Sequence, residues 1–240
     1  HLEVMVGRIK NEHNCAVVTG RPKVSYKQRL TAPLETIATF KRQSGGRGQY
    51  AVCHVRFDEM EDMTQQFEFV DAIKGGNIPR EYIPAVNKGL ASSVKAGGKL
   101  GFPFVGVKAT VYDGKYHDVD SSEMAFKIAG QYVFREAARR AKPVLMEPIM
   151  AVEVVTPEEY MGDVMGDIST HRGKIQGMDA KGPFQIIRAK VPLSELYNYA
   201  TRLRSITQGR GIFRRWFANY EEVPGDVQQR IVADYKAAKE

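Results

Sequence analysis

The 240-residue sequence contains only two cysteines, Cys15 and Cys53, and no Cys-x-x-Cys pair. The missing spacing excludes a zinc knuckle, and two cysteines are too few for a disulfide-stapled scaffold. Each cysteine lies in an apolar run, so we expect both to be small buried hydrophobic residues. Free thiols of this kind are typical of the reducing cytosol, so we expect a cytoplasmic protein.

Long apolar runs are also missing. No stretch approaches the roughly 18 uninterrupted apolar residues that a membrane helix needs, and residues 1–8 lack the pattern of a secretory signal. We therefore expect no membrane partner. Hydrophobic residues make up 43% of the chain and charged residues 26%, as in ordinary globular proteins, and the length allows one or two domains.

A nucleotide-binding loop is absent as well. Such a loop needs a glycine-rich run that ends in Gly-Lys-Ser/Thr, because backbone amides hold the phosphates and the hydroxyl holds magnesium. Here Gly98 and Lys99 are followed by Leu100, which cannot bind the metal. We expect this chain itself to be no GTPase, to have no catalytic residues and to hold no cofactor.

Acidic residues are scarce in one segment. The net charge of +7 divides into +6 for residues 1–150 and +1 for residues 151–240. Between residues 21 and 57, eight Lys and Arg residues accompany a single acid, Glu35. A one-sided basic segment attracts polyanions, above all nucleic acid, although a solvated surface is the alternative explanation.

Hydrophobic periodicity predicts a mixed α and β pattern in the first 145 residues. The expected elements are an opening helix over 2–9, strands over 15–18, 34–43, 49–57, 67–73 and 105–111, and helices over 84–96 and 120–141. Asp120, with Glu123 three residues later, is expected to cap the last of these helices. That helix is apolar nearly all round, so most of it should be buried.

Two prolines within residues 142–148 mark the expected domain boundary. After it the pattern is strand, helix, strand, strand, helix, strand, over 149–155, 157–171, 173–179, 184–191, 193–207 and 211–220. This βαββαβ order is that of the split ferredoxin-like unit. A last amphipathic helix follows Pro224.

Two polar turns form the candidate functional site. The first joins the strands over 34–43 and 49–57 and consists of Ser44, Gly45, Gly46, Arg47, Gly48 and Gln49. The second contains Tyr116, His117 and Asp118, and Lys41 and Arg42 form a supporting basic patch. Main-chain N–H groups with Arg and Gln side chains can contact phosphates and base edges of structured RNA without catalysis.

A second hypothesis uses His117, Asp118 and Asp120 as a metal site for phosphodiester hydrolysis. One turn cannot supply a complete set of metal ligands, and Asp120 is better used as a helix cap. We therefore expect no metal, and the metal-dependent nuclease stays as the alternative of another class.

Five longer motifs follow one another along the chain. They are KRQSGGRGQY at 41–50, PREYIPAV at 79–86, YDGKYHDVDSSEMAFK at 112–127, PEEYMGD at 157–163 and TQGRG at 207–211. In this order they resemble bacterial elongation factor G, and the resemblance covers essentially the whole chain.

The resemblance implies an α+β fold in which residues 1–20 end the family's third domain, 21–145 form its fourth, and 146–240 form its ferredoxin-like fifth with a C-terminal helix. The fourth domain is expected to have a ribosomal-protein-like β-α-β fold with a left-handed crossover, against the usual right-handed default. The full-length parent would be a GTPase whose GTP and Mg²⁺ are held in a domain upstream of this chain.

The implied function is to promote GTP-dependent translocation of tRNA and mRNA during protein synthesis. The two turns would be the ribosome-contacting tip, with His117 at the position that carries a modified histidine in the eukaryotic and archaeal factor. The implied partners are the small-subunit decoding region, the large-subunit stalk base, ribosomal RNA and the tRNA–mRNA complex, and the factor is expected to be a monomer.

Two departures from the usual family pattern leave an alternative open. They are the run AVC at 51–53 and the basic run RRW at 214–216. The alternative is a paralogue that acts in ribosome recycling or ribosome protection.

Overall fold

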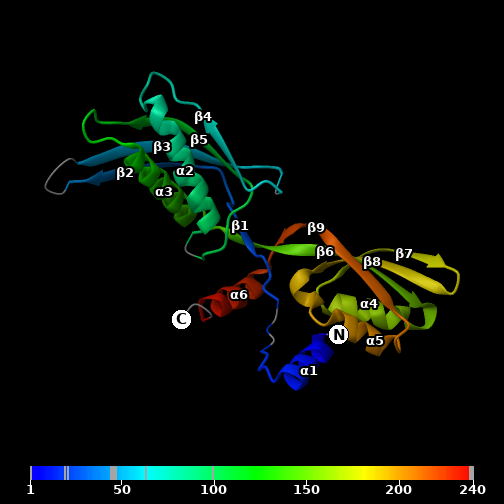
Figure 1. The fold of residues 1–240 in the computed structure, drawn as a ribbon. Coiled ribbons are helices and arrows are strands. Elements are labelled where there is room, and N and C mark those ends of the chain that lie inside the picture. The colour runs from blue at the N-terminus through cyan, green and yellow to red at the C-terminus, as the bar shows by residue number, and fades with distance from the viewer. Residues whose placement is uncertain are drawn as a thin grey trace. The chain divides into compact units, whose positions relative to one another are not determined.

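The computed structural model describes residues 2–18, 20, 22–43, 48–62, 64–98 and 100–237, and it is a mixed α+β structure (Figure 1). The chain forms two compact units. Unit 1 consists of His1–Val24 and Ala151–Trp216, and unit 2 of Ser25–Met150 and Phe217–Glu240. Within the described ranges, no helix is both long and apolar enough to cross a membrane.

A four-stranded sheet organises unit 2. Its order is β2 (Leu34–Arg42), β3 (Gln49–Glu59), β5 (Val107–Lys115) and β4 (Phe67–Asp71). The pairs β2–β3 and β3–β5 are antiparallel, whereas β4 and β5 are parallel. A helix lies in the connection between the parallel strands β4 and β5, so the expected β-α-β unit is present. The left-handed crossover of this unit stays a prediction.

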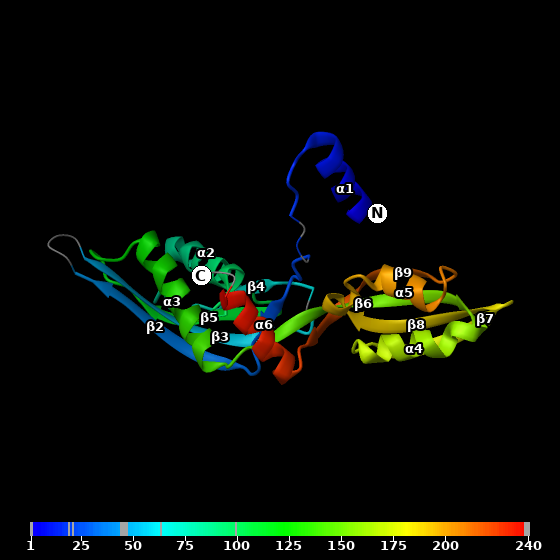
Figure 2. The same ribbon diagram turned by 90° about the horizontal axis from the view of Figure 1, so that it is seen from below.

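Two long helices cover one face of this sheet (Figures 1 and 2). They are α2 (Ile83–Ala96), which follows the 3₁₀ turn Arg80–Tyr82, and α3 (Glu123–Arg140). Glycine lets them approach closely, because a Cβ at Gly89 would lie 2.1 Å from the carbonyl oxygen of Lys127. The core between helices and sheet includes the fully buried Phe57, Leu90, Phe104, Phe126 and Phe134.

Helix α3 differs from the sequence prediction in two ways. Its N-cap is Ser122, whose side chain accepts a hydrogen bond from the backbone N–H of Ala125, so the prediction of Asp120 as the cap was wrong. Its apolar residues also do not all lie inside, because Met124 is 57% exposed. The helix buries one face, which packs on the sheet and on α2, and leaves the other to solvent.

A smaller cluster completes unit 2. The short strand β1 (Lys27–Arg29) pairs antiparallel with the first residues of β6 (Val144–Pro157). Helix α6 (Gly225–Ala237) brings Val227, Ile231 and Tyr235 against the buried Phe102, Leu145 and Val223. The C-terminal helix therefore packs with residues 25–150, whereas the sequence assigned it to the domain over 146–240.

Unit 1 has the predicted βαββαβ order. After β6 come the 3₁₀ turn Glu158–Tyr160, α4 (Met161–Thr170), β7 (Lys174–Lys181), β8 (Phe184–Pro192), the 3₁₀ turn Leu193–Leu196, α5 (Tyr199–Ile206) and β9 (Ile212–Glu222). In the sheet, β6 lies between β8 and β9, and β7 is next to β8. This is the strand arrangement of a ferredoxin-like domain.

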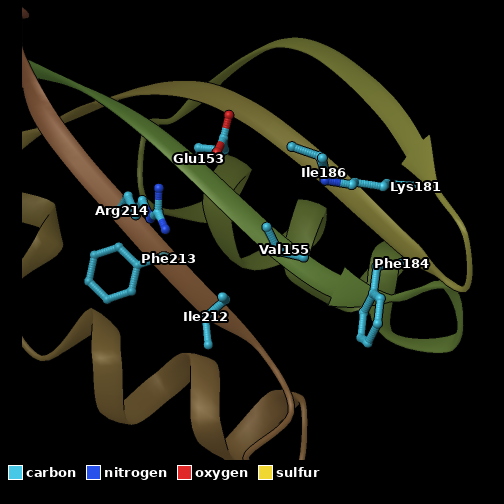
Figure 3. Close-up of a pocket in the computed structure, with 8 residues that line it drawn as sticks. All are labelled: Glu153, Val155, Lys181, Phe184, Ile186, Ile212, Phe213 and Arg214. Atoms are coloured by element: carbon cyan, nitrogen blue, oxygen red, sulfur yellow. The ribbon is translucent and has the colours of Figure 1, made fainter.

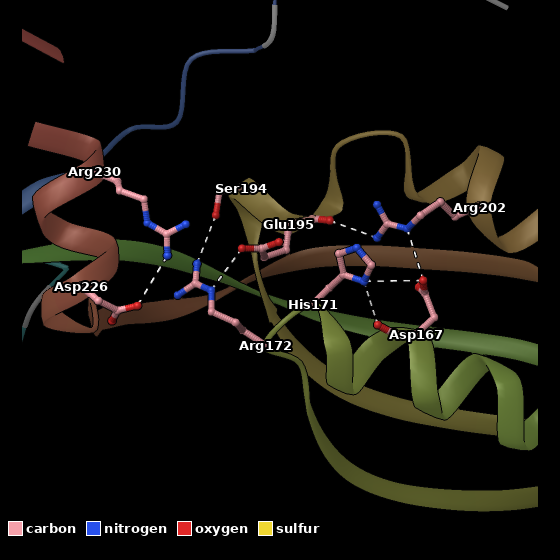
Figure 4. Close-up of polar contacts among 8 residues, drawn as sticks. All are labelled: Asp167, His171, Arg172, Ser194, Glu195, Arg202, Asp226 and Arg230. Atoms are coloured by element: carbon pink, nitrogen blue, oxygen red, sulfur yellow. Dashed lines mark hydrogen bonds and ion pairs between the residues drawn. The ribbon is translucent and has the colours of Figure 1, made fainter. Parts of the chain in front are cut away.

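Charged side chains join α4 to α5 at one end of unit 1 (Figure 4). Asp167 Oδ1 lies 3.4 Å from Arg202 Nε and 3.5 Å from His171 Nδ1. Arg202 also donates to the carbonyl oxygens of Tyr197 and Glu195, and Arg172 pairs with the Glu195 carboxylate at 3.1 Å. These contacts stabilise the ends of the helices of unit 1.

The N-terminal segment agrees only partly with the prediction. Helix α1 (Leu2–His13) is present, but residues 14–18 form no strand. Cys15 is exposed, so its prediction as a buried residue was wrong, because its apolar run forms no strand and stays open to solvent. Cys53 is buried as predicted, and burial raises the pKa of its thiol to about 12.

We predict that a maleimide at pH 8 labels Cys15 and leaves Cys53 unlabelled in the folded protein. The reactive species is the thiolate, which burial disfavours at Cys53, whereas Cys15 is exposed to the reagent. Mass spectrometry of peptides from native and urea-unfolded protein checks this. Labelling of both cysteines at equal rates before unfolding would contradict the burial of β3.

Candidate nucleic-acid interface

The end of the β2–β3 hairpin positions the first predicted turn. The register pairs Lys41 with Tyr50 and Arg42 with Gln49, so the strands remain paired up to the turn. Lys41 and Arg42 are both exposed. The predicted contact residues Ser44, Gly45, Gly46 and Arg47 lie outside the described residues, whereas Gly48 and Gln49 are described.

The second predicted turn, with Tyr116, His117 and Asp118, lies in the connection from β5 to α3, beside this hairpin end (Figure 1). Hydrogen bonds connect the two turns directly. The Tyr50 N–H donates to the carbonyl oxygen of Asp120 at 2.9 Å, and the Ser121 hydroxyl donates to the carbonyl oxygen of Tyr50 at 2.7 Å. The Gly48 N–H donates to Oδ1 of Asp120 at 3.0 Å. We call this set the inter-turn bonds.

Glycine at position 48 permits this close approach. A Cβ there would lie 2.9 Å from Cγ of Asp120, so any side chain would displace the carboxylate. The carboxylate that the sequence assigned to helix capping instead accepts a hydrogen bond from the neighbouring turn. Asp120 therefore holds the tip together, and Ser122 caps α3.

His117 lies on the outside of this assembly with 57% of its side chain exposed. Its Nδ1 accepts from the backbone N–H groups of Val119 and Asp120, each at 3.3 Å, and its ring meets the Tyr50 ring edge-on at 6.4 Å between centroids. A nitrogen that accepts carries no proton, so the neutral imidazole carries its proton on Nε2. His117 thus presents an N–H donor from an oriented ring.

The neighbouring residues are exposed in the way that a contact surface requires. Tyr116, His117 and Asp118 form a continuous exposed stretch, and Val119 is 59% exposed. Just before the turn, Asp113 accepts from the Asn77 side chain and the Gly114 N–H, and these bonds lower the pKa of its carboxyl group. These two bonds hold the Asp113 carboxylate at the end of β5, before the turn begins.

Sequence reasoning missed Tyr50 as part of the site. Its backbone N–H and carbonyl both bond to the second turn, and its ring supports His117. The signal in the sequence that could have identified Tyr50 is its position directly after the glycine-rich turn. Its partners are about 70 residues away in the chain, and no local pattern indicates such a pairing.

The nuclease hypothesis gains no support from the geometry. Nδ1 of His117 lies 3.7 Å from Oδ2 of Asp120, but the same carboxylate is bonded to Gly48. In the part of the chain that the structure describes, no group of three or more His, Cys, Asp or Glu side chains could hold a metal ion.

Unit 1 has a separate shallow hollow of about 330 Å³ over its sheet (Figure 3). Apolar side chains from three strands line it, and charged groups lie at its rim. The lining residues are Glu153, Val155, Lys181, Phe184, Ile186, Ile212, Phe213 and Arg214. The lining combines no nucleophile with a base. The tip of unit 2 remains the candidate site.

Together, the described residues form an α+β chain of two units, and in unit 2 two segments far apart in the sequence are hydrogen-bonded to each other at one end of a four-stranded sheet. Residues 22–142 match the family model of elongation factor G, domain IV, and residues 144–231 match that of the elongation factor G C-terminus. The chain belongs to the elongation factor G family.

A solved structure supports the same assignment. A crystal structure of a protein from Thermus thermophilus is 37% identical in sequence and superposes with a TM-score of 0.88. The match covers 100% of this chain and 35% of that protein. The chain thus spans about a third of the length of this relative.

We predict that His117→Ala changes the free energy of unfolding by no more than about 0.5 kcal/mol, because the exposed ring leaves no cavity. Asp120→Ala should cost about 1 kcal/mol, because it leaves the Gly48 N–H without its acceptor. Urea denaturation of both variants measures the difference, with Asp118→Ala as an exposed carboxylate control. Equal losses for His117→Ala and Asp120→Ala would show that the tip is not held by the Asp120 carboxylate.

Proposed function

We propose that this chain is the ribosome-binding C-terminal part of a translation factor that promotes GTP-dependent translocation of tRNA and mRNA. Family membership supports the class, and the inter-turn bonds are the observation that carries the proposal. They join the end of the β2–β3 hairpin to the exposed stretch 116–119, which is distant in sequence. A probe that enters a confined RNA site needs this kind of preorganised end.

The proposed mechanism is steric and electrostatic. The tip occupies space that the tRNA–mRNA complex vacates in the small-subunit decoding region and so blocks its return. Lys41 and Arg42 attract RNA phosphates, and the Nε2–H of His117 donates to an RNA acceptor. The chain performs no chemistry itself, and GTP with Mg²⁺ acts in a domain of the parent protein outside this chain.

The other partners follow from the same proposal. Unit 1 contacts the stalk base of the large subunit, and the factor works as a cytoplasmic monomer on ribosomal RNA. A paralogue that recycles or protects ribosomes is the second candidate. The paralogue is supported by strand β9, where Arg214 and Arg215 are exposed and Trp216 is 51% exposed. This basic and aromatic run departs from the usual family pattern.

We predict that binding of the chain to ribosomes weakens steeply with salt, because cations at the tip displace counterions from RNA. Replacing Lys41, Arg42 and Arg47 together by Ala should flatten the plot of log affinity against log salt by about 2 to 3. Sedimentation with ribosomes between low and moderate salt measures the slope. An unchanged slope would mean that the basic patch is only a solvated surface.

We predict that His117→Ala in the full-length parent slows tRNA movement and leaves GTP hydrolysis intact, because the tip is remote from the nucleotide site. His117→Lys should restore part of the rate if positive charge is needed, and none if a directed hydrogen bond is needed. Fluorescent tRNA and phosphate-release assays on the same ribosomes separate the two steps. Wild-type subunit splitting with no translocation by the parent would favour the paralogue.

A further inference from the structure

Strand β2 is an edge strand of the sheet in unit 2. In the described part of the chain it pairs only with β3, at one end of the order β2-β3-β5-β4 (Figures 1 and 2). Its nine residues pair with β3 in one unbroken register, without a proline or a bulge, and residues 36–40 carry no charge. Proteins usually interrupt or charge a long edge strand, because an open edge pairs readily with another strand.

Strand β7, at one end of the sheet in unit 1, shows the usual protection. Its register against β8 shifts between Ile175 and Gly177, and a lysine lies at each of its ends, Lys174 and Lys181. The middle of β2 has neither device. Its edge is therefore suited to pairing with a further strand.

Alternate residues of β2 direct their main-chain groups toward this open edge. In β3, the N–H and the carbonyl of Tyr50 both bond to the turn after β5. The partner of Tyr50 in β2 is Lys41. Opposite residues of an antiparallel pair exchange both hydrogen bonds or neither, so Lys41 also points its N–H and carbonyl away from β3. Alternation along the strand gives the same direction to Thr39, Ile37 and Glu35.

A contact from α3 supports this direction independently. Nη1 of Arg140 donates to the carbonyl oxygen of Glu35 at 3.0 Å and so covers one end of the edge. For Ile37 and Thr39, no main-chain hydrogen bond to another described residue lies outside the β2–β3 pairing. Their N–H groups and carbonyls are therefore open to a further strand.

A groove runs along this edge, with β2 on one side and α3 on the other, and has a volume of about 540 Å³. We call it the edge groove. Its lining residues are Ile37, Ala38, Thr39, Tyr132, Arg135, Glu136 and Arg139. Ile37 is 57% exposed and Tyr132 is 42% exposed, so apolar surface accompanies the open main-chain groups.

The charge of the edge groove favours an acidic ligand. Glu136 is bound to Arg139 at 2.7 Å, so its charge is compensated. Arg135 is exposed and makes no ion pair or side-chain hydrogen bond with any residue that the structure describes. Lys41 and Arg42 continue the positive charge at the end of the strand. A segment with carboxylates complements this lining, whereas a basic segment is repelled.

We propose that the edge groove binds an extended acidic segment of a partner protein, which adds to β2 as an antiparallel strand. Residues opposite Ile37 and Thr39 exchange main-chain hydrogen bonds with them, and their side chains lie on the sheet face away from α3. The residues between them face α3, where a carboxylate meets Arg135. Main-chain bonds thus give affinity and alternate side chains give specificity, as in other cases of strand addition.

A protein strand fits this edge better than a nucleic acid. Phosphate oxygens only accept hydrogen bonds, whereas the open carbonyls of Ile37 and Thr39 need donors. A peptide main chain supplies donors and acceptors in alternation. The inference does not rest on the proposed function, because it concerns peptide binding by unit 2 without ribosomes or RNA.

The test uses the whole chain and four labelled peptides of seven residues with capped ends. The first alternates Val and Glu, beginning and ending with Val. The second carries N-methyl groups on two of its valines, and the third on two of its glutamates. In the proposed pairing the Val N–H groups face β2 and the Glu N–H groups face away, so only the second peptide loses bonds. The fourth has Lys in place of Glu.

Two pairs of protein variants complete the design. Thr39→Pro removes an N–H group at the open edge without removing a bond to β3, a position where proline is tolerated, and Thr39→Val is its control. Arg135→Glu reverses the charge of the groove, and Lys95→Glu makes the same charge change at an exposed position of α2. Thermal melting establishes that each variant is folded.

Fluorescence anisotropy measures binding. We expect the Val and Glu peptide to bind, and the peptides with N-methyl-Val or Lys to bind more weakly by about tenfold or more. The peptide with N-methyl-Glu should bind like the first. Thr39→Pro and Arg135→Glu should weaken binding by about tenfold, and their controls by no more than about twofold. Amide hydrogen exchange at Ile37 and Thr39 should be fast in the free chain and slow with the peptide bound.

Four results would overturn the proposal. They are no binding at about 1 mM of the first peptide, equal binding of the N-methyl-Val peptide, equal binding of the Lys peptide, and a dimer of the chain that Thr39→Pro abolishes. The last result would assign the edge to a second copy of this chain. If Thr39→Pro does not fold, the two N-methylated peptides still decide whether a strand is added. None of these results bears on the tip, so the proposed function is tested separately.

Discussion

The hydrogen bonds between Asp120 and Ser121 of one turn and Gly48 and Tyr50 of the other are the constraint on which the candidate site depends. Separately, a hairpin end and a strand-to-helix turn are the parts of a domain with the least packing to hold them. When hydrogen bonds join them, the hairpin end and the strand-to-helix turn restrict each other's backbone motion. The result is that His117 has an oriented ring although more than half of its side chain is exposed.

The rigid body behind the tip makes this arrangement effective. Helix α3 starts at the second turn and packs against α2 so closely that the carbonyl of Lys127 occupies the space of a side chain at Gly89. Both helices rest on the β2-β3-β5-β4 sheet, whose buried aromatic residues leave little freedom for the helices to slide.

Charge is distributed along unit 2 in two places with different surroundings. At the tip, Lys41 and Arg42 stand on exposed strand ends, where salt screens them strongly. At the C-terminal ends of α2 and α3, Arg135 and Lys142 line a hollow together with glycine, amide and apolar residues.

The sequence alone determined most of the order of the elements, because apolar periodicity and glycine or proline breaks are local properties, but it wrongly predicted a strand over 15–18 and did not predict β1. It predicted the βαββαβ unit, the β2–β3 hairpin and the two polar turns, and the motifs from 41–50 to 207–211 predicted the family. It misassigned Asp120 as a cap and Cys15 as buried, since both decisions depend on which partner is near. Only the tertiary structure decided that Asp120 bonds Gly48, that α6 packs on Phe102 and Leu145, and that Gln28 lines a groove with Arg135 and Lys142. These are contacts between residues far apart in the chain, and their energies arise only when packing brings the groups together.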